Sequence, residues 1–472
     1  MRIIKRLTSK RAVFSLVLTL LWGSHLLPNW AQAQSPGNNA VYNSSATCCS
    51  ASSSFIDASV SAASQGTDLC ATIYNIFAST HGNPTYPSAG AVIDARGISG
   101  SALTCGSNES PWLSGGTYQP KASVILLPSG TINISYTWIL PNNTKIVGEG
   151  ASNTGSTGTV IAAASNLTGP GVSGYPLSMI QFGDSTATGA NCGPCFRISI
   201  QDVTLNASLV TSVHVGGILN LDSQELTYAK RISLLGISGI GVENGDSTSA
   251  SGPQNAGPYE QIYYSSHTGT CAQIYGAGMR GIHGITCIGN TTSPISGGGI
   301  LLDSTDNSIE DVFVDGYTDG ILVGSQPSTS SRAWGNVFFN INGGSTVTNV
   351  VHLCGSTGTS PCPTTGGTAV QDASFIGVTS GNSSGKSIKD EASGATLADT
   401  HVGIYALGDP FSVGYSRFTT SRTVPSWFTG SPVATTGSAC SAATGSIYTA
   451  TTVAVGTGTA WACVGGQWHL VH

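Results

Sequence analysis

Acidic side chains gather in one short part of a chain that is otherwise weakly charged. Only 8% of the 472 residues are charged, yet six of the 23 acids fall between Asp303 and Asp319. Asp303, Asp306 and Glu310 lie close together within this stretch. Paired carboxyl groups hydrolyse glycosidic bonds, about 5–5.5 Å apart for retention and about 6.5–9.5 Å for inversion. These three residues are therefore candidate catalytic carboxylates.

Arg280 and His283 precede the acidic stretch and could serve a different reaction. Elimination from a uronate polysaccharide needs a cation to neutralise the sugar carboxylate and a base to remove a proton. Arg forks onto carboxylates, and His titrates near neutrality. The acidic residues could instead hold Ca²⁺, which prefers clustered oxygen ligands. The sequence indicates no other cofactor and no other metal site. Solvated turn acids and a structural His283 remain the alternative interpretation.

Three tyrosines, Tyr259, Tyr263 and Tyr264, crowd into the segment 253–270, which we interpret as a loop beside the acidic stretch. Aromatic rings offer flat apolar surfaces with a polar tip, which suits the apolar faces of sugar rings. We therefore predict that these tyrosines bind substrate. Tyrosine is also a common strand residue, so a purely structural role is the alternative.

The elements that would position these residues are short strands with little chain between them. Residues 297–324 contain three strand-like runs, Ile300–Leu302, Ile309–Val314 and Ile321–Val323, separated only by turn residues. Parallel strands normally need a crossover of a dozen or more residues. A right-handed parallel β-helix avoids the crossover, because each strand pairs with the equivalent strand one coil later. The stretch therefore predicts an all-β solenoid.

Internal repeats support this fold and set the register of the candidate site. The string GGILNLDS, which begins at Gly216, recurs as GGILLDS from Gly298. Strand-like patterns begin at Ile282 and again 27 residues later, which is typical of a coil with variable loops. This period places His283 and Glu310 on one outward face, about 5 Å apart at the backbone. It separates Asp222 from Asp303 by three coils, too far for a catalytic pair.

The start of the solenoid is predicted to be covered by a helix. Thr67 or Asp68 can cap a helix over about 69–79, with Leu69, Ile73 and Phe77 on its apolar side. Such a helix would cover the first coil and blunt its exposed strand edge.

Residues 124–150, VILLPSGTINISYTWILPNNTKIVGEG, together with the upstream strings FIDAS, DLCATIYNIF and IDARG, resemble the pectate-lyase-like superfamily of secreted bacterial β-helix proteins. The resemblance spans about 55–410 and is specific for the fold, not for an activity. The polygalacturonase motifs are not reproduced: the nearest strings are Gly281-Ile-His283-Gly284 and Ser304-Thr-Asp306, in the reverse order. No known catalytic set can therefore be carried over.

The sequence divides into five segments. Residues 1–33 have a basic start, an apolar run and an Ala-Gln-Ala site, and are interpreted as a signal peptide. We predict an N-terminal segment with the capping helix over 34–90, the β-helix over 91–410 and a linker over 411–439. Residues 440–472 are predicted to be a small disulfide-stapled β unit.

Removing residues 1–33 takes away five positive charges and changes the net charge from −6 to −11. Nucleic acid is therefore not expected as a partner, nor is a membrane span after cleavage.

The twelve cysteines are an even number in a chain expected to be exported, so disulfides are predicted. Expected pairs are Cys271–Cys287, Cys354–Cys362 and Cys440–Cys463, with Cys48, Cys49, Cys70 and Cys105 pairing among themselves in an unassigned order.

The sequence leads to two hypotheses for function. The first is a secreted protein that binds an extended polysaccharide, and cleaves it by hydrolysis or β-elimination if it is an enzyme. The second is a non-catalytic extracellular or cell-surface adhesion protein of the same fold. The identity of the polysaccharide and the oligomeric state are left open.

Overall fold

A computed structural model describes most of the chain between residues 55 and 391 and several short strands after it. The described residues are 55–60, 68–98, 103–106, 108–170, 177–183, 195–245, 255–276, 281–325, 332–354, 361–362, 369–371, 373–391, 404–405, 427–430, 447–450, 460–464 and 467–471. The predicted signal peptide, Arg280 and Cys440 lie outside them. Within the described residues, no helix is long and apolar enough to cross a membrane.

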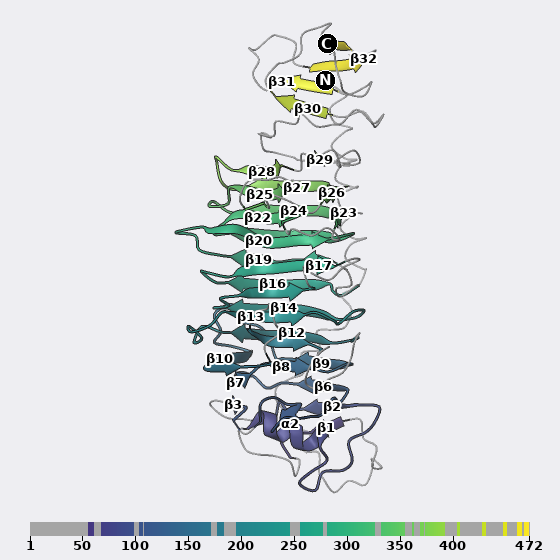
Figure 1. Ribbon diagram of the computed structural model, residues 1–472, viewed down its shortest axis with the longest axis vertical. Helices are drawn as coiled ribbons and strands as arrows, with labels where there is room; N and C mark the ends of the chain where they lie inside the picture. Colours follow the sequence, from purple (N-terminus) through teal and green to yellow (C-terminus); the bar gives the residue numbers. More distant parts are fainter. Residues whose placement is uncertain are drawn as a thin grey trace, which may run out of the picture. The chain divides into compact units, whose positions relative to one another are not determined.

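Two long sheets with parallel pairing form the body of the fold, as predicted for a right-handed parallel β-helix (Figure 1). The larger, which we call sheet 1, follows the order β1 (Phe55–Asp57), β2 (Ala91–Asp94), β6 (Ser123–Leu126), β9 (Thr144–Val147), β12 (Ser199–Asn206), β14 (Tyr228–Leu235), β16 (Tyr259–Ser265), β18 (Ile282–His283), β21 (Ser308–Asp315), β24 (Val337–Gly343), β27 (Ser374–Ser380) and β29 (Ile404–Tyr405). Beside this path lie β3 (Leu103–Thr104), β7 (Gly130–Tyr136), β10 (Thr159–Thr168) and β19 (Thr286–Ile288).

The second sheet, sheet 2, consists of strands that alternate along the chain with those of sheet 1. Its members are β8 (Trp138–Leu140), β11 (Leu177–Phe182), β13 (Val215–Asn220), β15 (Ile240–Asn244), β17 (Thr270–Gly276), β20 (Ile295–Ser304), β22 (Tyr317–Val323), β25 (Asn349–Leu353) and β28 (Lys386–Asp390). From β12 to β28 the coils therefore contribute to both sheets in turn, and the inward side chains of the two sheets form one continuous apolar core.

Smaller pairings lie outside these two sheets. β4 (Leu113–Ser114) and β5 (Thr117–Tyr118) form an antiparallel pair, and β23 (Arg332–Trp334) pairs with β26 (Ala369–Gln371). The C-terminal sheet contains β30 (Trp427–Gly430), β31 (Ile447–Ala450), β32 (Ala460–Val464) and β33 (Gln467–Val471). Its antiparallel strands fall in the predicted C-terminal β unit, but β30 lies within the segment that we predicted to be a linker.

Sheet 1 bends at the same place in seven successive coils. One residue per coil has a positive φ between 52° and 68°, namely Asp202, Arg231, Gln261, Gly284, Asp311, Asn340 and Gly377. The strand register stacks these residues on one another. Their side chains also bond across coils where they can: Asn340 Nδ2 donates to Asp311 Oδ1 at 2.7 Å. This row of positive-φ residues divides the outward face of sheet 1 into a part before the bend and a part after it.

The predicted capping helix is present as α2 (Leu69–Phe77). The Asp68 side chain caps it by accepting a hydrogen bond from the Ala71 amide at 2.9 Å. Its buried face meets the first coils through aromatic rings: Phe77 stacks on Trp112 at 6.4 Å, and Trp112 meets Trp138 edge-to-face at 6.3 Å. The helix therefore covers the apolar core at its open end.

Replacing Asp68 with Ala should destabilise the capping end by about 1 kcal/mol, because the orphan amide of the first turn loses its acceptor. Urea denaturation followed by the near-ultraviolet signal of the neighbouring tryptophans would measure the loss. Asp68→Asn is the matched control, since Asn caps equally well. An equal loss in both variants would contradict the capping role.

Three of the predicted disulfide relationships fall on described residues, and all are confirmed. Cys271 pairs with Cys287 and Cys354 with Cys362, as expected. Cys70 pairs with Cys105, which selects one of the open arrangements of the N-terminal cysteines. Disulfides form in oxidising compartments, so these pairings are compatible with secretion.

Candidate functional site

One column of side chains on the outward face of sheet 1, before the bend, contains the predicted His283–Glu310 pair. Strand register places Lys230, Glu260, His283, Glu310 and Phe339 on successive strands from β14 to β24. The prediction that His283 and Glu310 are neighbours is confirmed. Neighbouring strands are about 4.8 Å apart, so these five residues form a linear array of four polar groups followed by an aromatic ring. The register continues to Gln201 on β12 and to Ile376 on β27.

Contacts within this column leave one polar atom without a partner. Lys230 Nζ forms an ion pair with Glu260, and Ser308 Oγ donates to Glu310. His283 is half-buried, and its Nε2 has no hydrogen-bond partner. Nε2 itself is buried, so the His283 side chain must turn before that atom can meet a ligand at the column beside Glu310.

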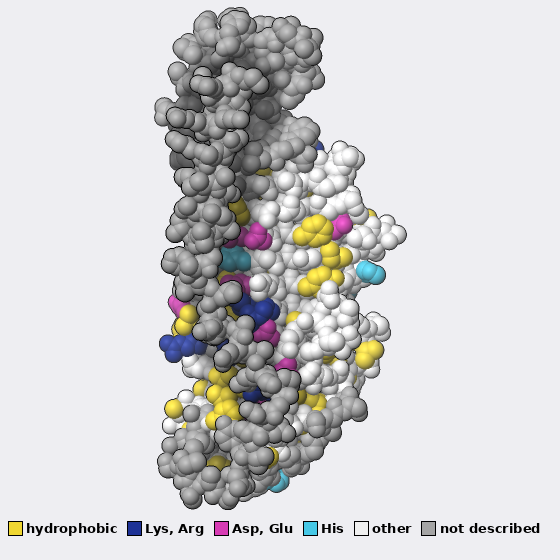
Figure 2. Space-filling view, turned by 180° about the vertical axis from the view of Figure 1, so that it is seen from behind, with side chains coloured by type: hydrophobic (Ala, Val, Ile, Leu, Met, Phe, Trp, Pro, Cys, Tyr) yellow, Lys and Arg dark blue, Asp and Glu magenta, His cyan; other side chains and the backbone are white. Residues whose placement is uncertain are grey.

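Exposed apolar side chains lie next to the column. Phe339 is 46% exposed and Val337 40%, both on β24, and Phe313 on β21 is 38% exposed. Register sets Phe339 directly beside Glu310. Figure 2 shows hydrophobic side chains gathered in a compact group on the described surface, with an acidic side chain at its border. Exposed apolar groups beside polar ones mark a surface suited to a ligand.

The other predicted acids do not share this face. Asp303 ends β20 in sheet 2, where it is buried and accepts a hydrogen bond from Ser325 Oγ at 3.1 Å. Asp306 is exposed in the turn that follows, with φ at +56°. Glu310 lies in sheet 1. Asp303, Asp306 and Glu310 thus occupy three different parts of one coil, because seven residues carry the chain around the corner between the two sheets. Arg280 lies outside the described residues.

The prediction that Tyr259, Tyr263 and Tyr264 lie in a loop is wrong. Residues 259–265 form β16 of sheet 1 and not a loop, and the rings of Tyr259 and Tyr264 are 1% and 0% exposed in the core. Tyr259 Oη donates to Asn244 Oδ1 at 2.6 Å, and Tyr264 Oη to the Ile237 carbonyl at 3.2 Å. Burial raises the pKa of both phenols, that of Tyr264 to about 12. Neither can stack on a sugar. Tyr263 points outward, is half-buried and remains a candidate contact.

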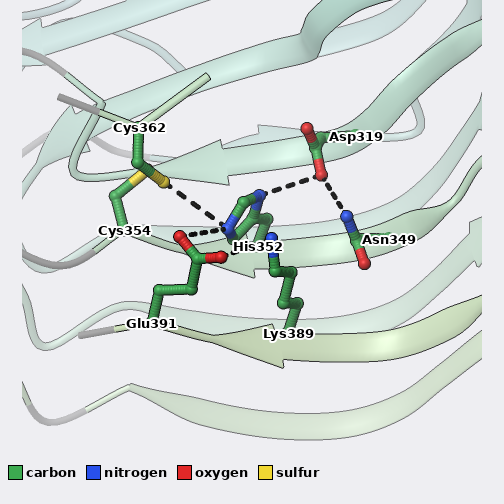
Figure 3. Close-up of polar contacts among 7 residues, drawn as sticks. All are labelled: Asp319, Asn349, His352, Cys354, Cys362, Lys389 and Glu391. Carbon is green, nitrogen blue, oxygen red and sulfur yellow. Dashed lines mark hydrogen bonds and ion pairs between the residues drawn. A yellow bond between two sulfur atoms is a disulfide. The ribbon is translucent and has the colours of Figure 1, made fainter. Parts of the chain in front are cut away.

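A buried cluster on sheet 2 was not predicted (Figure 3). His352 on β25 and Asp319 on β22 are both 0% exposed. Asp319 Oδ1 accepts a hydrogen bond from Asn349 Nδ2 at 2.6 Å and lies 2.9 Å from His352 Nδ1. A buried carboxylate in this position fixes the ring orientation and tautomer of the histidine. The other imidazole nitrogen, Nε2, is thereby held toward the opposite side of the cluster.

On that opposite side, His352 Nε2 faces sulfur and oxygen. It lies 3.5 Å from Cys362 Sγ, in the Cys354–Cys362 disulfide, and 3.4 Å from Glu391 Oε2. Glu391 also forms an ion pair with Lys389, which neighbours His352 in the register of β25 and β28. A histidine is thus held between two carboxylates and a disulfide.

Metal-ligand geometry also favours this cluster over the acidic stretch. Within the described ranges, one group of three or more ligating side chains comes within reach of a single ion: His352, Cys354 and Cys362, whose ligand atoms lie within 4.8 Å of one another. The acidic residues from Asp303 to Asp319 do not form such a group. The calcium site that we considered there is therefore not supported by the side-chain geometry.

The similarities of this chain to known proteins are distant. No family model and no curated protein sequence matches the chain. Among solved structures, it is similar to the A-modules of the Azotobacter vinelandii mannuronan C-5 epimerases AlgE4 and AlgE6, at 11% and 12% identity and TM-scores of 0.27 and 0.30. Each match covers 61% of this chain, and 91% and 88% of the respective module.

A third match is ORF18 of Geobacillus virus E2, at 12% identity and a TM-score of 0.24, covering 56% of this chain and 52% of that one. At these TM-scores the likenesses carry no argument about activity. The β-helix assignment rests on the strand pairing within this chain.

Proposed function

We propose that the chain is a secreted protein that binds an extended polysaccharide along the outward face of sheet 1. The observation that carries this proposal is the column from Lys230 to Phe339, in which successive coils present one side chain each at a regular spacing. A ligand with its own linear repeat can meet several such groups at once. A compact ligand would use only two or three of them.

The chemistry of the column suits a sugar chain. Its polar members are partly exposed and offer donors and acceptors to hydroxyl groups, while Phe339 offers a flat apolar surface. Phe313, beyond the bend on β21, adds a second exposed ring to sheet 1. The net charge of −6 and the near balance of charges along the column do not favour a polyanion such as nucleic acid. A neutral or weakly charged polysaccharide fits this surface best.

Cleavage of the bound chain is a second candidate function, and one specific observation favours it. His283 Nε2 has no partner and lies one strand from Glu310. Glu260 lies on the other side of His283, two strand spacings or about 9.6 Å from Glu310 at the backbone. In inverting hydrolases the two carboxyl groups are about 6.5–9.5 Å apart, so Glu260 and Glu310 are the candidate pair if their carboxyl groups lean toward each other from this backbone spacing. In an elimination, His283 would act as the base after its side chain turned to expose the buried Nε2.

Replacing Phe339 with Ala should weaken polysaccharide binding about five- to tenfold, because one stacking surface is worth roughly 1 kcal/mol. Affinity electrophoresis or calorimetry against a panel of neutral and uronate polysaccharides would measure the change. Phe55→Ala is the matched control: Phe55 is also on sheet 1 and 50% exposed, but it lies many coils away on β1. An equal loss in both variants, or no binding to any polysaccharide, would contradict the proposal.

The same panel separates binding from catalysis. Release of reducing ends without unsaturated uronate indicates hydrolysis, and absorbance of unsaturated uronate indicates elimination. Glu310→Gln should abolish a hydrolytic activity and His283→Ala an elimination, whereas Asp311→Asn on the adjacent exposed position should abolish neither. Binding without either product would leave the non-catalytic adhesion function as the conclusion.

A further inference from the structure

The cluster around His352 has a feature that polysaccharide binding does not use. Three potential metal ligands, His352, Cys354 and Cys362, are fully buried and already within 4.8 Å of one another. Two of them are joined in a disulfide and therefore offer no thiolate. The group can ligate a metal only after that bond is broken.

We propose that reduction of the Cys354–Cys362 disulfide converts this cluster into a Zn²⁺ site formed by Cys354, Cys362, His352 Nε2 and the Glu391 carboxylate. A dithiol supplies two electrons and two protons, the S–S bond breaks, two thiols form, and the dithiol becomes a disulfide. Zn²⁺ then binds the two sulfurs as thiolates and releases two protons. The two redox forms of the chain thus differ in whether they hold a metal.

Distances in the oxidised cluster fit this geometry. In a tetrahedral site with bonds of about 2.0–2.3 Å, ligand atoms lie about 3.4–3.8 Å from one another. His352 Nε2 is 3.5 Å from Cys362 Sγ and 3.4 Å from Glu391 Oε2. The histidine is therefore already at tetrahedral spacing from one sulfur and from the carboxylate. Glu391 is not in the group of ligand atoms within 4.8 Å of one another, so binding requires the two sulfurs to separate and the carboxylate to approach them.

The surroundings of His352 provide the outer contacts that a metal-binding histidine requires. Ligating imidazoles usually donate their other N–H to a carboxylate, which fixes the ring and raises its basicity. Asp319 Oδ1 holds His352 Nδ1 in this way at 2.9 Å and is itself fixed by Asn349. Its second oxygen, Oδ2, is buried without a partner. Asp319 is thus a positioning residue for the proposed site.

Zinc stoichiometry tests the proposal. The full chain is reduced with a phosphine, freed of reductant without oxygen, given Zn²⁺ and separated from unbound metal. The reduced wild type should hold one more Zn²⁺ per chain than the Cys354→Ser/Cys362→Ser double variant, and the oxidised wild type should hold none at this site. Cys271→Ser/Cys287→Ser is the matched control, since it removes another buried disulfide, and it should retain the extra ion.

Equal zinc content in the reduced wild type and the Cys354→Ser/Cys362→Ser variant would overturn the proposal. Alkylation of the reduced wild type, mapped by mass spectrometry, gives a reading that needs no variant. Zn²⁺ should slow alkylation of Cys354 and Cys362 but not of Cys271 and Cys287, and equal rates at both pairs would also overturn it. Asp319→Asn should keep the stoichiometry but weaken Zn²⁺ affinity about 10–100-fold.

Discussion

Above about pH 10 the folded chain should lose roughly 5 kcal/mol of unfolding free energy per pH unit, and it should unfold in alkali well before its backbone is damaged. The cause is a set of four tyrosines buried in the core or at its end: Tyr86, Tyr259, Tyr264 and Tyr317. Burial raises the pKa of each phenol, to about 12 for Tyr86 and Tyr264.

The sign of the effect follows from proton binding. In the unfolded chain these tyrosines ionise near pH 10, but the folded chain keeps them protonated to a higher pH. Between those values the folded state binds more protons, so stability falls as pH rises. Each tyrosine contributes about 1.4 kcal/mol per pH unit, and its contribution is fully present below pH 10. For Tyr86 and Tyr264 it is lost as the pH approaches 12.

Urea midpoints measured from pH 9 to 12 would test this prediction, with tyrosinate absorbance reporting ionisation directly. Tyr264→Phe should reduce the slope by about 1.4 kcal/mol per pH unit, whatever its cost at neutral pH. Tyr263→Phe is the matched control, because Tyr263 neighbours Tyr264 but faces outward. A slope unchanged by Tyr264→Phe would mean that this phenol ionises in the folded state and is not protected.

The register of the coils was predictable where the repeat length is regular. His283 and Glu310 are 27 residues apart, and the period alone set them side by side. Between β14 and β18 the lengths are uneven: Lys230 and Glu260 are 30 residues apart, but Glu260 and His283 only 23. A long coil followed by a short one gives the same mean period as two regular coils, so the mean does not locate the strand between them. This is why the prediction of a loop over 253–270 is wrong: the segment contains strand β16.

Clustering in sequence was a poor guide to clustering in space. The stretch from Asp303 to Asp319 runs from sheet 2 through a turn and sheet 1 and back to sheet 2. Two of its acids bond to neighbouring coils: Asp311 accepts from Asn340, and Asp315 accepts from Thr346 Oγ1 at 2.5 Å. A solenoid brings together residues one period apart and separates those half a period apart.

The His352 cluster could not be found from local motifs. Asp319 and His352 are 33 residues apart, and His352 and Glu391 are 39 apart. These offsets exceed the coil period because loops of different length intervene. The sequence offered one signal for this cluster: His352 lies two residues before the predicted Cys354–Cys362 disulfide. That disulfide fixes one loop of the cluster. The sequence does not specify which coil supplies the carboxylates, since that depends on sheet register.

Buried tyrosines hold adjacent coils together by packing on glycine backbone. The Tyr317 ring is 0% exposed, and its hydroxyl donates to the Gly269 carbonyl at 3.0 Å. A Cβ added at Gly289 would lie 2.8 Å from the Tyr317 ring, and one added at Gly299 would lie 3.0 Å from it. No larger residue than glycine fits at these two positions while the ring is present. The aromatic side chain and the glycines around it therefore form one packing unit that spans several coils.

Replacing Tyr317 with Ala should cost about 3–5 kcal/mol, because the space left between several coils cannot collapse onto glycine backbone. Tyr317→Phe separates packing from hydrogen bonding and should cost only about 1–3 kcal/mol, the penalty for leaving the Gly269 carbonyl without its donor. Urea denaturation at pH 7 would measure both, with hydrogen exchange of β17 and β20 showing where the loss is felt. If the two variants lost the same stability, the hydroxyl and not the ring would be the main link between these coils.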